Sequence, residues 1–302
     1  MFSPSSRHST TRLLTREPPL LEKHPTDTFE TILFLPKREE RQGEGGLRTQ
    51  GYFKRSLPDK PLITVITVVF NGAKHLEETI LSVINQTYDN VEYIVIDGGS
   101  TDRTLDIIRQ YEHAIDYWVS ERDRGIYDAM NKGINLSADS DFLYFLGDDD
   151  TLFNKKVIGN FFNKKINKNN DIIYGFTTTD NHIKVVSRFS YLLLIHNCLH
   201  HQAAFYKKKL FFDFRYDTKY KISADYELNL IAKITKKKVA YIDTHIATCR
   251  TDGVSTKKSN YFNHIIETNR IKRKVFKGKI LLNFSNFIFW SKAIVYYVIR
   301  HK

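Results

Sequence analysis

Residues 142–150, Phe-Leu-Tyr-Phe-Leu-Gly-Asp-Asp-Asp, join a run of five apolar residues to three adjacent carboxylates. The apolar run is too short to span a membrane and is typical of a strand buried on both faces of a parallel sheet. Ligands of open α/β sheets bind where the chain leaves the carboxyl ends of such strands. Three crowded carboxylates repel one another unless a cation offsets them, which favours a divalent metal bridging to a phosphate. A solvated acidic turn is the alternative, and for an isolated triplet it would be the better one.

The chain before this stretch alternates apolar, β-branched runs with segments of helical spacing. The expected strands cover residues 62–70, 91–96 and 117–119, and the expected helices cover residues 74–85, 105–111 and 128–136. Short connections between strand, helix and strand predict a parallel sheet with right-handed crossovers, which is a Rossmann-like nucleotide-binding half. Beyond residue 150 the pattern is weaker, and we expect strands at 172–176, 182–187 and 239–242 and a helix at 224–233.

The two ends of the chain differ from this α/β region, which we expect to cover residues 61–256. Residues 1–60 combine a Ser/Thr-rich start with several prolines and a glycine cluster at 43–46, and this composition predicts a disordered tail. An organelle transit peptide shares some of these features, and an over-extended reading frame is a further alternative. Residues 257–302 form a basic and aromatic segment that we expect to be a helical extension.

The net charge of +12 is concentrated in this last segment. Between Lys257 and Lys279 there are eight Lys or Arg residues and one acid, Glu267. The acidic stretch lies elsewhere, so the charge does not mark a binding cleft for nucleic acid, and we expect no nucleic-acid partner. Residues 280–299 are apolar and aromatic but include Lys292, which is costly inside a spanning helix. A helix lying in the membrane interface is favoured over a core-packed or a spanning one.

The two cysteines of the chain provide no disulfide framework and no metal-ligand spacing, which fits a reducing cytoplasm. Together with the basic and aromatic C-terminal segment, this predicts a cytoplasmic protein, peripheral on the inner face of the plasma membrane.

Asp97 ends another predicted buried strand, in the sequence IVIDGGSTDRT. Two following glycines let a backbone or a ligand approach closely, and a carboxylate at a strand end can accept hydrogen bonds from a base or a ribose. Asp102, by contrast, is well explained as a cap of the next helix. The chain has neither a dinucleotide-type glycine fingerprint nor a Walker loop, so we expect phosphate to be held through a metal near residues 148–150.

Taken together, these motifs resemble a known family. The segments ITVVFNGAKHLEETILSVINQTYDNVEYIVIDGGSTDRT, SERDRGIYDAMNKGI and FLYFLGDDDTL follow one another in the order and spacing of a family 2 glycosyltransferase with the GT-A fold. The likeness covers about residues 62–256 and is greatest to bacterial enzymes of exopolysaccharide and O-antigen synthesis, of the colanic-acid type. It implies an α/β fold with a mostly parallel sheet flanked by helices.

The resemblance also implies roles for the donor-side residues. Asn71 matches the turn near the nucleotide, and Asp97 matches the aspartate that binds base or ribose. Asp149 and Asp150 match the acidic pair that holds a divalent cation, Mn²⁺ or Mg²⁺, with Asp149 also near the nucleotide. Asp148 falls on a variable position, so its role stays open.

On the acceptor side, the resemblance makes Asp225 the catalytic base and His201 and Gln202 an acceptor-side pair. Residues 252–255 resemble a loop near the end of the catalytic domain. Asp225 also opens a predicted helix, where an anion is stabilised without any catalytic role. The neighbouring histidines could suggest zinc, but they lack a second ligand cluster.

These residues suit the displacement of a nucleoside diphosphate from a sugar. A cation offsets charge on the leaving diphosphate, and a base removes the acceptor hydroxyl proton, so one in-line displacement inverts the anomeric centre. We therefore expect an inverting, metal-dependent transferase that uses a UDP-sugar and a saccharide or lipid-linked acceptor. A Gln-x-x-Arg-Trp motif is missing, which argues against a processive synthase. The alternatives are a sugar-phosphate nucleotidyltransferase and a non-enzymatic basic protein that binds membrane or nucleic acid.

Overall fold

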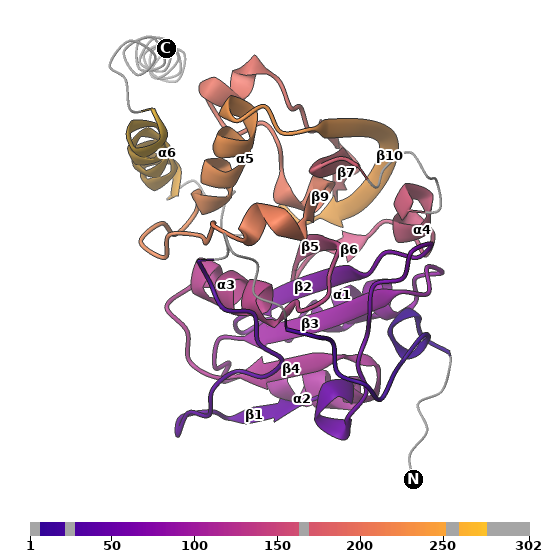
Figure 1. The fold of residues 1–302 in the computed structure, drawn as a ribbon. Coiled ribbons are helices and arrows are strands. Elements are labelled where there is room, and N and C mark those ends of the chain that lie inside the picture. Colours follow the sequence, from indigo (N-terminus) through magenta and orange to yellow (C-terminus); the bar gives the residue numbers. More distant parts are fainter. Residues whose placement is uncertain (1–6, 22–27, 163–168, 252–259, 277–302) are drawn as a thin grey trace.

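One mixed sheet organises the chain (Figure 1). The computed structural model describes residues 7–21, 28–162, 169–251 and 260–276, and within these ranges ten strands form the sheet. Their order is β1-β4-β3-β2-β5-β9-β7-β10-β6, with β8 paired to β7. Among the helices of these ranges, none combines the length and the apolar character needed to cross a bilayer.

The first half of the sheet is the parallel arrangement that the sequence predicts. Its strands are β2 (Ile63–Val69), β3 (Val91–Asp97), β4 (Tyr117–Ser120) and β5 (Phe142–Gly147), and they pair with one another in parallel, in the order β4-β3-β2-β5. The connecting helices are α1 (Leu76–Ile84), α2 (Thr104–Gln110) and α3 (Ile126–Leu136). Every residue of β2 and β3 is buried, which explains why these strands are predominantly apolar and β-branched in the sequence.

The second half of the sheet is mixed. Strand β9 (Ala204–Lys207) runs antiparallel to both β5 and β7 (Ile172–Thr179), so β7 and its parallel partner β10 (Val239–Cys249) run in the same direction as β5. Two short strands, β6 (Thr151–Leu152) and β8 (Lys184–Val186), pair antiparallel with β10 and β7. The remaining α-helices are α4 (Val157–Phe162), α5 (Ala224–Ile234) and α6 (Tyr261–Val275). Short 3₁₀ helices are η1 (Ser9–Thr11), η2 (Leu47–Gln50), η3 (Glu112–Ala114), η5 (Tyr191–Leu194), η6 (His201–Ala203) and η7 (Lys208–Phe211).

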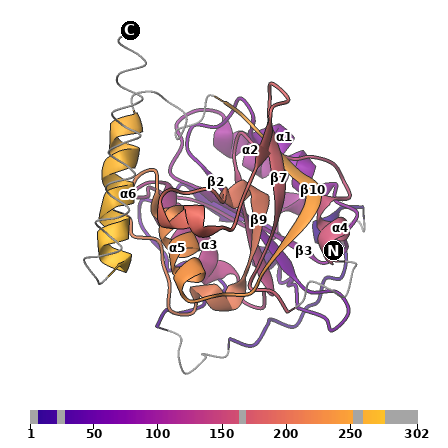
Figure 2. The ribbon, with the colours of Figure 1, turned by 90° about the horizontal axis from the view of Figure 1, so that it is seen from above.

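Helices cover both faces of the sheet, with α3, α5 and α6 on one side and α1, α2 and α4 on the other (Figure 2). Alternate residues of β2 point to opposite faces, so that Ile66 and Val68 belong to the first core, whereas Ile63 and Val65 belong to the second. Both faces of the central strands are therefore packed against apolar cores.

The expectation of a disordered tail at residues 1–60 differs from the structure, in which residues 7–21 and 28–60 pack on the domain. Strand β1 (Gly43–Gly45) adds an antiparallel edge strand beside β4. A Cβ atom on Gly45 would lie 2.6 Å from Trp118 Nε1, so glycine is required for this close approach. Ser9 and Thr10 donate hydrogen bonds to backbone carbonyls of the domain, at 2.9 and 2.7 Å. The small and polar residues that suggest disorder here serve packing and hydrogen bonding instead.

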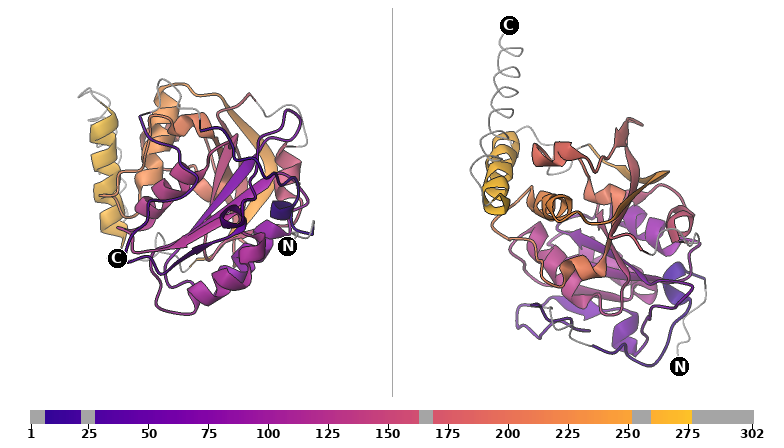
Figure 3. Two further views of the ribbon diagram at one scale, coloured as in Figure 1. Left: turned by 60° about the horizontal axis from the view of Figure 1, so that its bottom comes forward. Right: turned by 45° about the horizontal axis from the view of Figure 1, so that its top comes forward.

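Helix α6 lies alongside α5 on the outer side of the domain (Figure 3). Ile271 of α6 and the following Phe276 are 0% and 6% exposed and belong to the core between the sheet and α5. The interfacial helix expected at residues 280–299 and the loop at 252–255 lie outside the described residues.

Candidate active site

The carboxyl ends of the four parallel strands bring together the predicted donor-side residues. Asn71 follows β2, Asp97 ends β3, and residues 148–150 follow β5. The loops after β2 and β3 interlock, because Asn71 N donates to Ser100 Oγ at 2.7 Å and Asn71 Oδ1 accepts from Thr101 N at 2.9 Å. Asn71 has a φ of 55°, a left-handed conformation that asparagine tolerates better than most residues. Asn71 therefore fixes the shape of the edge where a nucleotide would bind.

Asp97 lies at the predicted strand end, but its carboxylate is fully buried. It accepts hydrogen bonds from Ser100 N and Oγ and from Ser120 Oγ, the last at 2.5 Å. The buried carboxylate of Asp97 therefore links the end of β3 to the end of β4 through its hydrogen bond from Ser120. Its contact with a base or a ribose stays a prediction.

Asp123 is a second acidic residue at this edge, and the sequence analysis assigned it no role. It follows β4, and its Oδ2 lies 2.6 Å from the position that a Cβ on Gly98 would take. Burial raises the pKa of Asp123, although a hydrogen bond from Gly125 N opposes this shift. The available signal was its place in the loop after the third predicted parallel strand, three residues beyond the end of β4 at Ser120.

The three carboxylates at 148–150 point in different directions. A Cβ on Gly147 would lie 2.9 Å from Asp150 Oδ2 and 3.1 Å from Asp149 Oδ1, whereas Asp148 Oδ2 lies against Gly72 in the loop after β2. Burial and the nearby Asp149 raise the pKa of Asp148 to about 7. Burial and the same neighbour raise the pKa of Asp150 to about 6. Both carboxylates are thus buried close to Asp149, and burial is the larger cause of their raised pKa values, with the charge of Asp149 second.

This crowding fits a bound divalent cation. Within the described ranges, no group of three or more His, Cys, Asp or Glu side chains is arranged to hold a metal ion. Two carboxylates suffice where ligand phosphates and water supply the remaining oxygens, which is the usual situation of Mg²⁺. The oxygens of Asp149 and Asp150 converge around the side-chain-free Gly147, so this pair fits such a cation better than Asp148 does.

Asp225 lies in the first turn of α5, and groups from other elements surround its carboxylate. Oδ2 accepts a hydrogen bond from Asn197 Nδ2 at 2.9 Å and lies 3.6 Å from His201 Nδ1, and Tyr127 Oη donates to Oδ1 at 3.4 Å. Burial raises the pKa of Asp225, but the hydrogen bond and charge of His201, together with Asn197, outweigh burial and lower it overall. The carboxylate is therefore ionised at neutral pH, as a general base must be.

His201 and Gln202 connect the two parts of the site. They are neighbours in η6, and while His201 faces Asp225, Gln202 Nε2 donates to Asp150 Oδ2 at 3.1 Å. The backbone carbonyl of Gln202 accepts a hydrogen bond from Tyr144 Oη in β5 at 2.8 Å. The short helix η6 therefore connects Asp150 of the acidic pair to the predicted base, Asp225. These two residues are 75 positions apart in the sequence.

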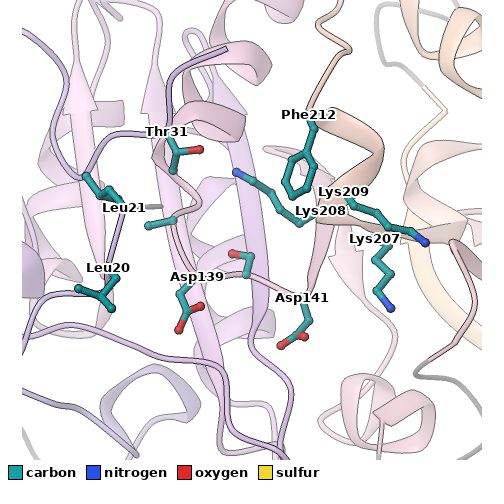
Figure 4. A pocket seen from close by; sticks show the side chains of 11 residues that line it. Leu20, Leu21, Thr31, Asp139, Asp141, Lys207, Lys208, Lys209 and Phe212 are labelled. Atoms are coloured by element: carbon teal, nitrogen blue, oxygen red, sulfur yellow. The ribbon is translucent and has the colours of Figure 1, made fainter. Parts of the chain in front are cut away.

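A hollow of about 280 Å³ lies away from these residues, near the amino-terminal end of β5 (Figure 4). Its charged side chains bond to protein groups. Asp141 Oδ2 accepts from Leu62 N at 2.8 Å, Lys208 Nζ donates to Ser137 O at 2.7 Å, and Lys209 Nζ lies 2.6 Å from Asp171 Oδ1. These pairs stabilise the connections between strands, and they show no arrangement for a ligand.

The fold and the acidic edge define an α/β transferase of the GT-A-like class. The model of glycosyl transferase family 2 matches residues 64–226, and the chain belongs to this family. This membership favours a transferase over the nucleotidyltransferase and the non-enzymatic alternatives.

Known proteins with similar sequences are glycosyltransferases. A PGL/p-HBAD biosynthesis glycosyltransferase of Mycobacterium tuberculosis is 32% identical over 181 residues, which are 56% of this chain and 69% of the relative. An uncharacterized glycosyltransferase of Haemophilus influenzae is 36% identical over 100 residues, which are 32% of this chain and 40% of the relative.

Solved structures confirm the predicted fold. S. aureus TarS 1-349 in complex with UDP-GlcNAc aligns with a TM-score of 0.57 and 15% identity over 74% of this chain and 70% of that chain. Mannosyltransferase PcManGT from Pyrobaculum calidifontis, in complex with GDP-Man and Mn²⁺, aligns with a TM-score of 0.52 and 19% identity, over 73% and 66%. The GT-A-like mixed sheet, flanked by helices, is shared with both.

Proposed function

We propose that this chain transfers a sugar from a UDP-sugar to a saccharide or lipid-linked acceptor, with inversion at the anomeric carbon and with the help of a divalent cation. Family membership supports the transfer of a sugar. A fold neighbour solved with UDP-GlcNAc supports the donor class, and another solved with GDP-Man and Mn²⁺ supports the cation. We further propose cell-surface polysaccharide synthesis of the exopolysaccharide or O-antigen type as the process.

The observation that carries the proposal is the connection between Asp150 and Asp225. Gln202 bonds to the first carboxylate and His201 faces the second. A donor held at the strand ends through Asp149 and Asp150 would present its anomeric carbon toward the side of the site where Asp225 lies. Such an arrangement places a negative pair at the leaving group and a base at the acceptor.

The reaction then balances in one step. The acceptor oxygen bonds to the anomeric carbon as the bond from that carbon to the diphosphate oxygen breaks, and the acceptor proton passes to Asp225. Asp149 and Asp150 would hold the cation, which, when bound, offsets the charge that grows on the leaving diphosphate. His201 and Asn197 keep Asp225 ionised and fix its orientation before the acceptor arrives.

A screen of nucleotide sugars tests the proposal. The purified chain is incubated with UDP-, GDP- and TDP-sugars and with Mn²⁺ or Mg²⁺, and release of nucleoside diphosphate is scored. We expect metal-dependent release from one class, with UDP-sugars preferred. Absence of both turnover and binding across all three classes would refute the proposed function.

We place the enzyme in the cytoplasm, peripheral on the inner face of the plasma membrane, where a lipid-linked acceptor would be found. The basic composition of residues 257–279 and the aromatic composition of residues 280–299 support this location. Flotation of the full chain with vesicles tests it, using phosphatidylglycerol vesicles against phosphatidylcholine vesicles. Equal recovery with both lipids, or no recovery with either, would contradict the electrostatic part of the proposal.

A further inference from the structure

Helix α6 lies outside residues 64–226, which the family model matches, yet it packs directly against the elements that carry Asp225. Figure 3 shows α6 beside α5. Two buried residues of α6, Glu267 and Lys272, which are 7% and 0% exposed, bond toward this region. Each contacts a segment that lies next to the predicted base.

Glu267 binds the backbone just before α5. Its Oε1 accepts a hydrogen bond from Lys221 N at 2.7 Å, and its Oε2 accepts from Ile222 N at 3.0 Å and from Ser223 N at 2.9 Å. Three consecutive amides are thus held by one carboxylate, and hydrogen bonds to a charged acceptor are among the strong ones. Asp225 follows two residues later, so the position of its backbone depends on this contact.

A second contact from α6 reaches the loop that carries Asn197. Lys272 Nζ donates to Ile195 O at 3.1 Å, and Asn197 is the residue whose amide bonds to Asp225 at 2.9 Å. His264, one turn before Glu267, lies 2.8 Å from Ser223 Oγ through its Nδ1. Helix α6 therefore holds both the segment before Asp225 and the segment of its hydrogen-bond donor.

We propose that Glu267 is a positioning residue of the transferase, and that α6 sets the orientation of Asp225 toward the acceptor side of the site. This inference rests on the proposed function, in which Asp225 is the general base. Its physical basis is that catalysis by a positioned group falls steeply when the group moves, with about 1 Å costing on the order of a hundredfold. Glu267 touches neither the acidic pair nor the donor edge, so it acts on the chemical step and leaves donor binding unaffected.

The chain offers a matched control on the same pair of helices. Lys274 Nζ lies 2.6 Å from Glu227 Oε1, which is another contact between α6 and α5 that involves a charged group. Glu227 lies in the same first turn of α5 as Asp225, but this contact does not hold the 221–223 backbone. Replacing Lys274 by Gln therefore weakens the packing of α6 without releasing the three amides.

The experiment compares the full-length wild type with Glu267→Gln, Glu267→Ala and Lys274→Gln. The probe is release of UDP from UDP-GlcNAc with Mn²⁺, or from the nucleotide sugar that wild type turns over fastest. We expect Glu267→Gln to lower kcat by about tenfold and Glu267→Ala to lower it further, while the donor KM stays within about twofold of wild type. Lys274→Gln should keep kcat within about twofold. Calorimetry with UDP provides a second readout, in which we expect an unchanged Kd for all variants.

The outcomes separate this inference from the proposed function. If wild type neither binds nor turns over any nucleotide sugar, the proposed function fails. If wild type is active and Glu267→Gln has the same kcat, only the positioning role fails. The positioning role also fails if Lys274→Gln loses as much kcat as Glu267→Gln, or if the loss appears in the donor KM or in the Kd for UDP. Should Glu267→Ala not fold, Glu267→Gln decides alone.

Discussion

Replacing Asp225 by Asn tests the base directly, because the change keeps the shape of the side chain and removes its ability to accept a proton. The environment of this carboxylate sets the expected size of the effect. Asn197 donates to Oδ2 at 2.9 Å, His201 lies 3.6 Å away, and Tyr127 lies 3.4 Å from Oδ1. Neither the amide of Asn197 nor the phenol of Tyr127 replaces the lost acceptor, because both are poor bases. We expect kcat to fall by about 10²–10⁴-fold, the usual worth of a positioned base.

Donor binding should survive the same substitution. The link from Asp225 to the acidic pair runs through the backbone of η6, and the bond from Gln202 to Asp150 stays in place. We therefore expect the Kd for UDP to stay within about threefold of wild type. Because the pKa of Asp225 is lowered in the folded state, its ionised form stabilises the fold above the unfolded value near 4, and this contribution is lost as the pH falls through the folded value. Asp225→Asn should accordingly lower stability at pH 7 more than at pH 3.

The assay is single-turnover release of nucleoside diphosphate, with binding followed separately by calorimetry. Glu227→Gln is the control, since Glu227 is a buried carboxylate in the same helix that pairs with Lys274 at 2.6 Å and is not part of the site. It should retain kcat within about threefold even if its melting temperature falls. Loss of UDP binding in Asp225→Asn, or an unchanged kcat, would refute the base role.

Three further predictions concern the acidic triplet and the N-terminal segment. Asp149→Asn and Asp150→Asn should each abolish Mn²⁺-dependent turnover and the rise in melting temperature on adding Mn²⁺. Asp148→Asn should retain that rise in melting temperature. If Asp149→Asn or Asp150→Asn also retains it, the assignment of these two residues as the metal pair is wrong. Since burial and Asp149 raise the pKa of Asp148 to about 7 and of Asp150 to about 6, the folded state keeps protons that the unfolded chain loses between about pH 4 and pH 7. Metal-free stability should then fall as the pH rises through this window, and Asp148→Asn should flatten that fall in urea titrations at pH 5 and pH 8. Gly45→Val should lower stability by about 1–3 kcal/mol, because its Cβ would meet Trp118 Nε1 at 2.6 Å, whereas a disordered tail would tolerate it without change.

The parallel half of the fold could be predicted because its signals are local. Strands β2 and β3 are buried along their whole length, and strands buried on both faces are predominantly apolar. Asp97 then stands out because it is a carboxylate at the end of such a strand, although it is itself buried. The same reasoning applied to the strand that ends at Ser120 identifies Glu121 first, with Asp123 as the second acid of the loop that follows.

In the mixed half, β7, β8, β10 and α5 lie where the sequence predicts them, but β9 and the sheet order could not be predicted. Strand β9 has four residues, AFYK, between two 3₁₀ helices, and it is defined by its antiparallel partners β5 and β7. Partners so distant in sequence leave no periodic pattern in the strand itself. Strand β1 is harder still, because two of its three residues are glycines whose role is to let the chain lie on Trp118. Composition alone cannot distinguish such glycines from those of a flexible tail.

Some of the residues that hold the site in place come from segments outside the family match. Gln42 N donates to Ser120 O at 2.8 Å, and Ser120 Oγ donates to Asp97, so the N-terminal segment supports the donor edge. Glu267 supports the backbone before Asp225 from the other end of the chain. Motifs identify side chains that suit a chemistry, but their relative placement depends on contacts that carry no motif. If that division holds, substitutions at Glu267 should change kcat without changing which donor is used. Sequence differences between relatives in these flanking segments should then alter the rate and the choice of acceptor more readily than the type of reaction.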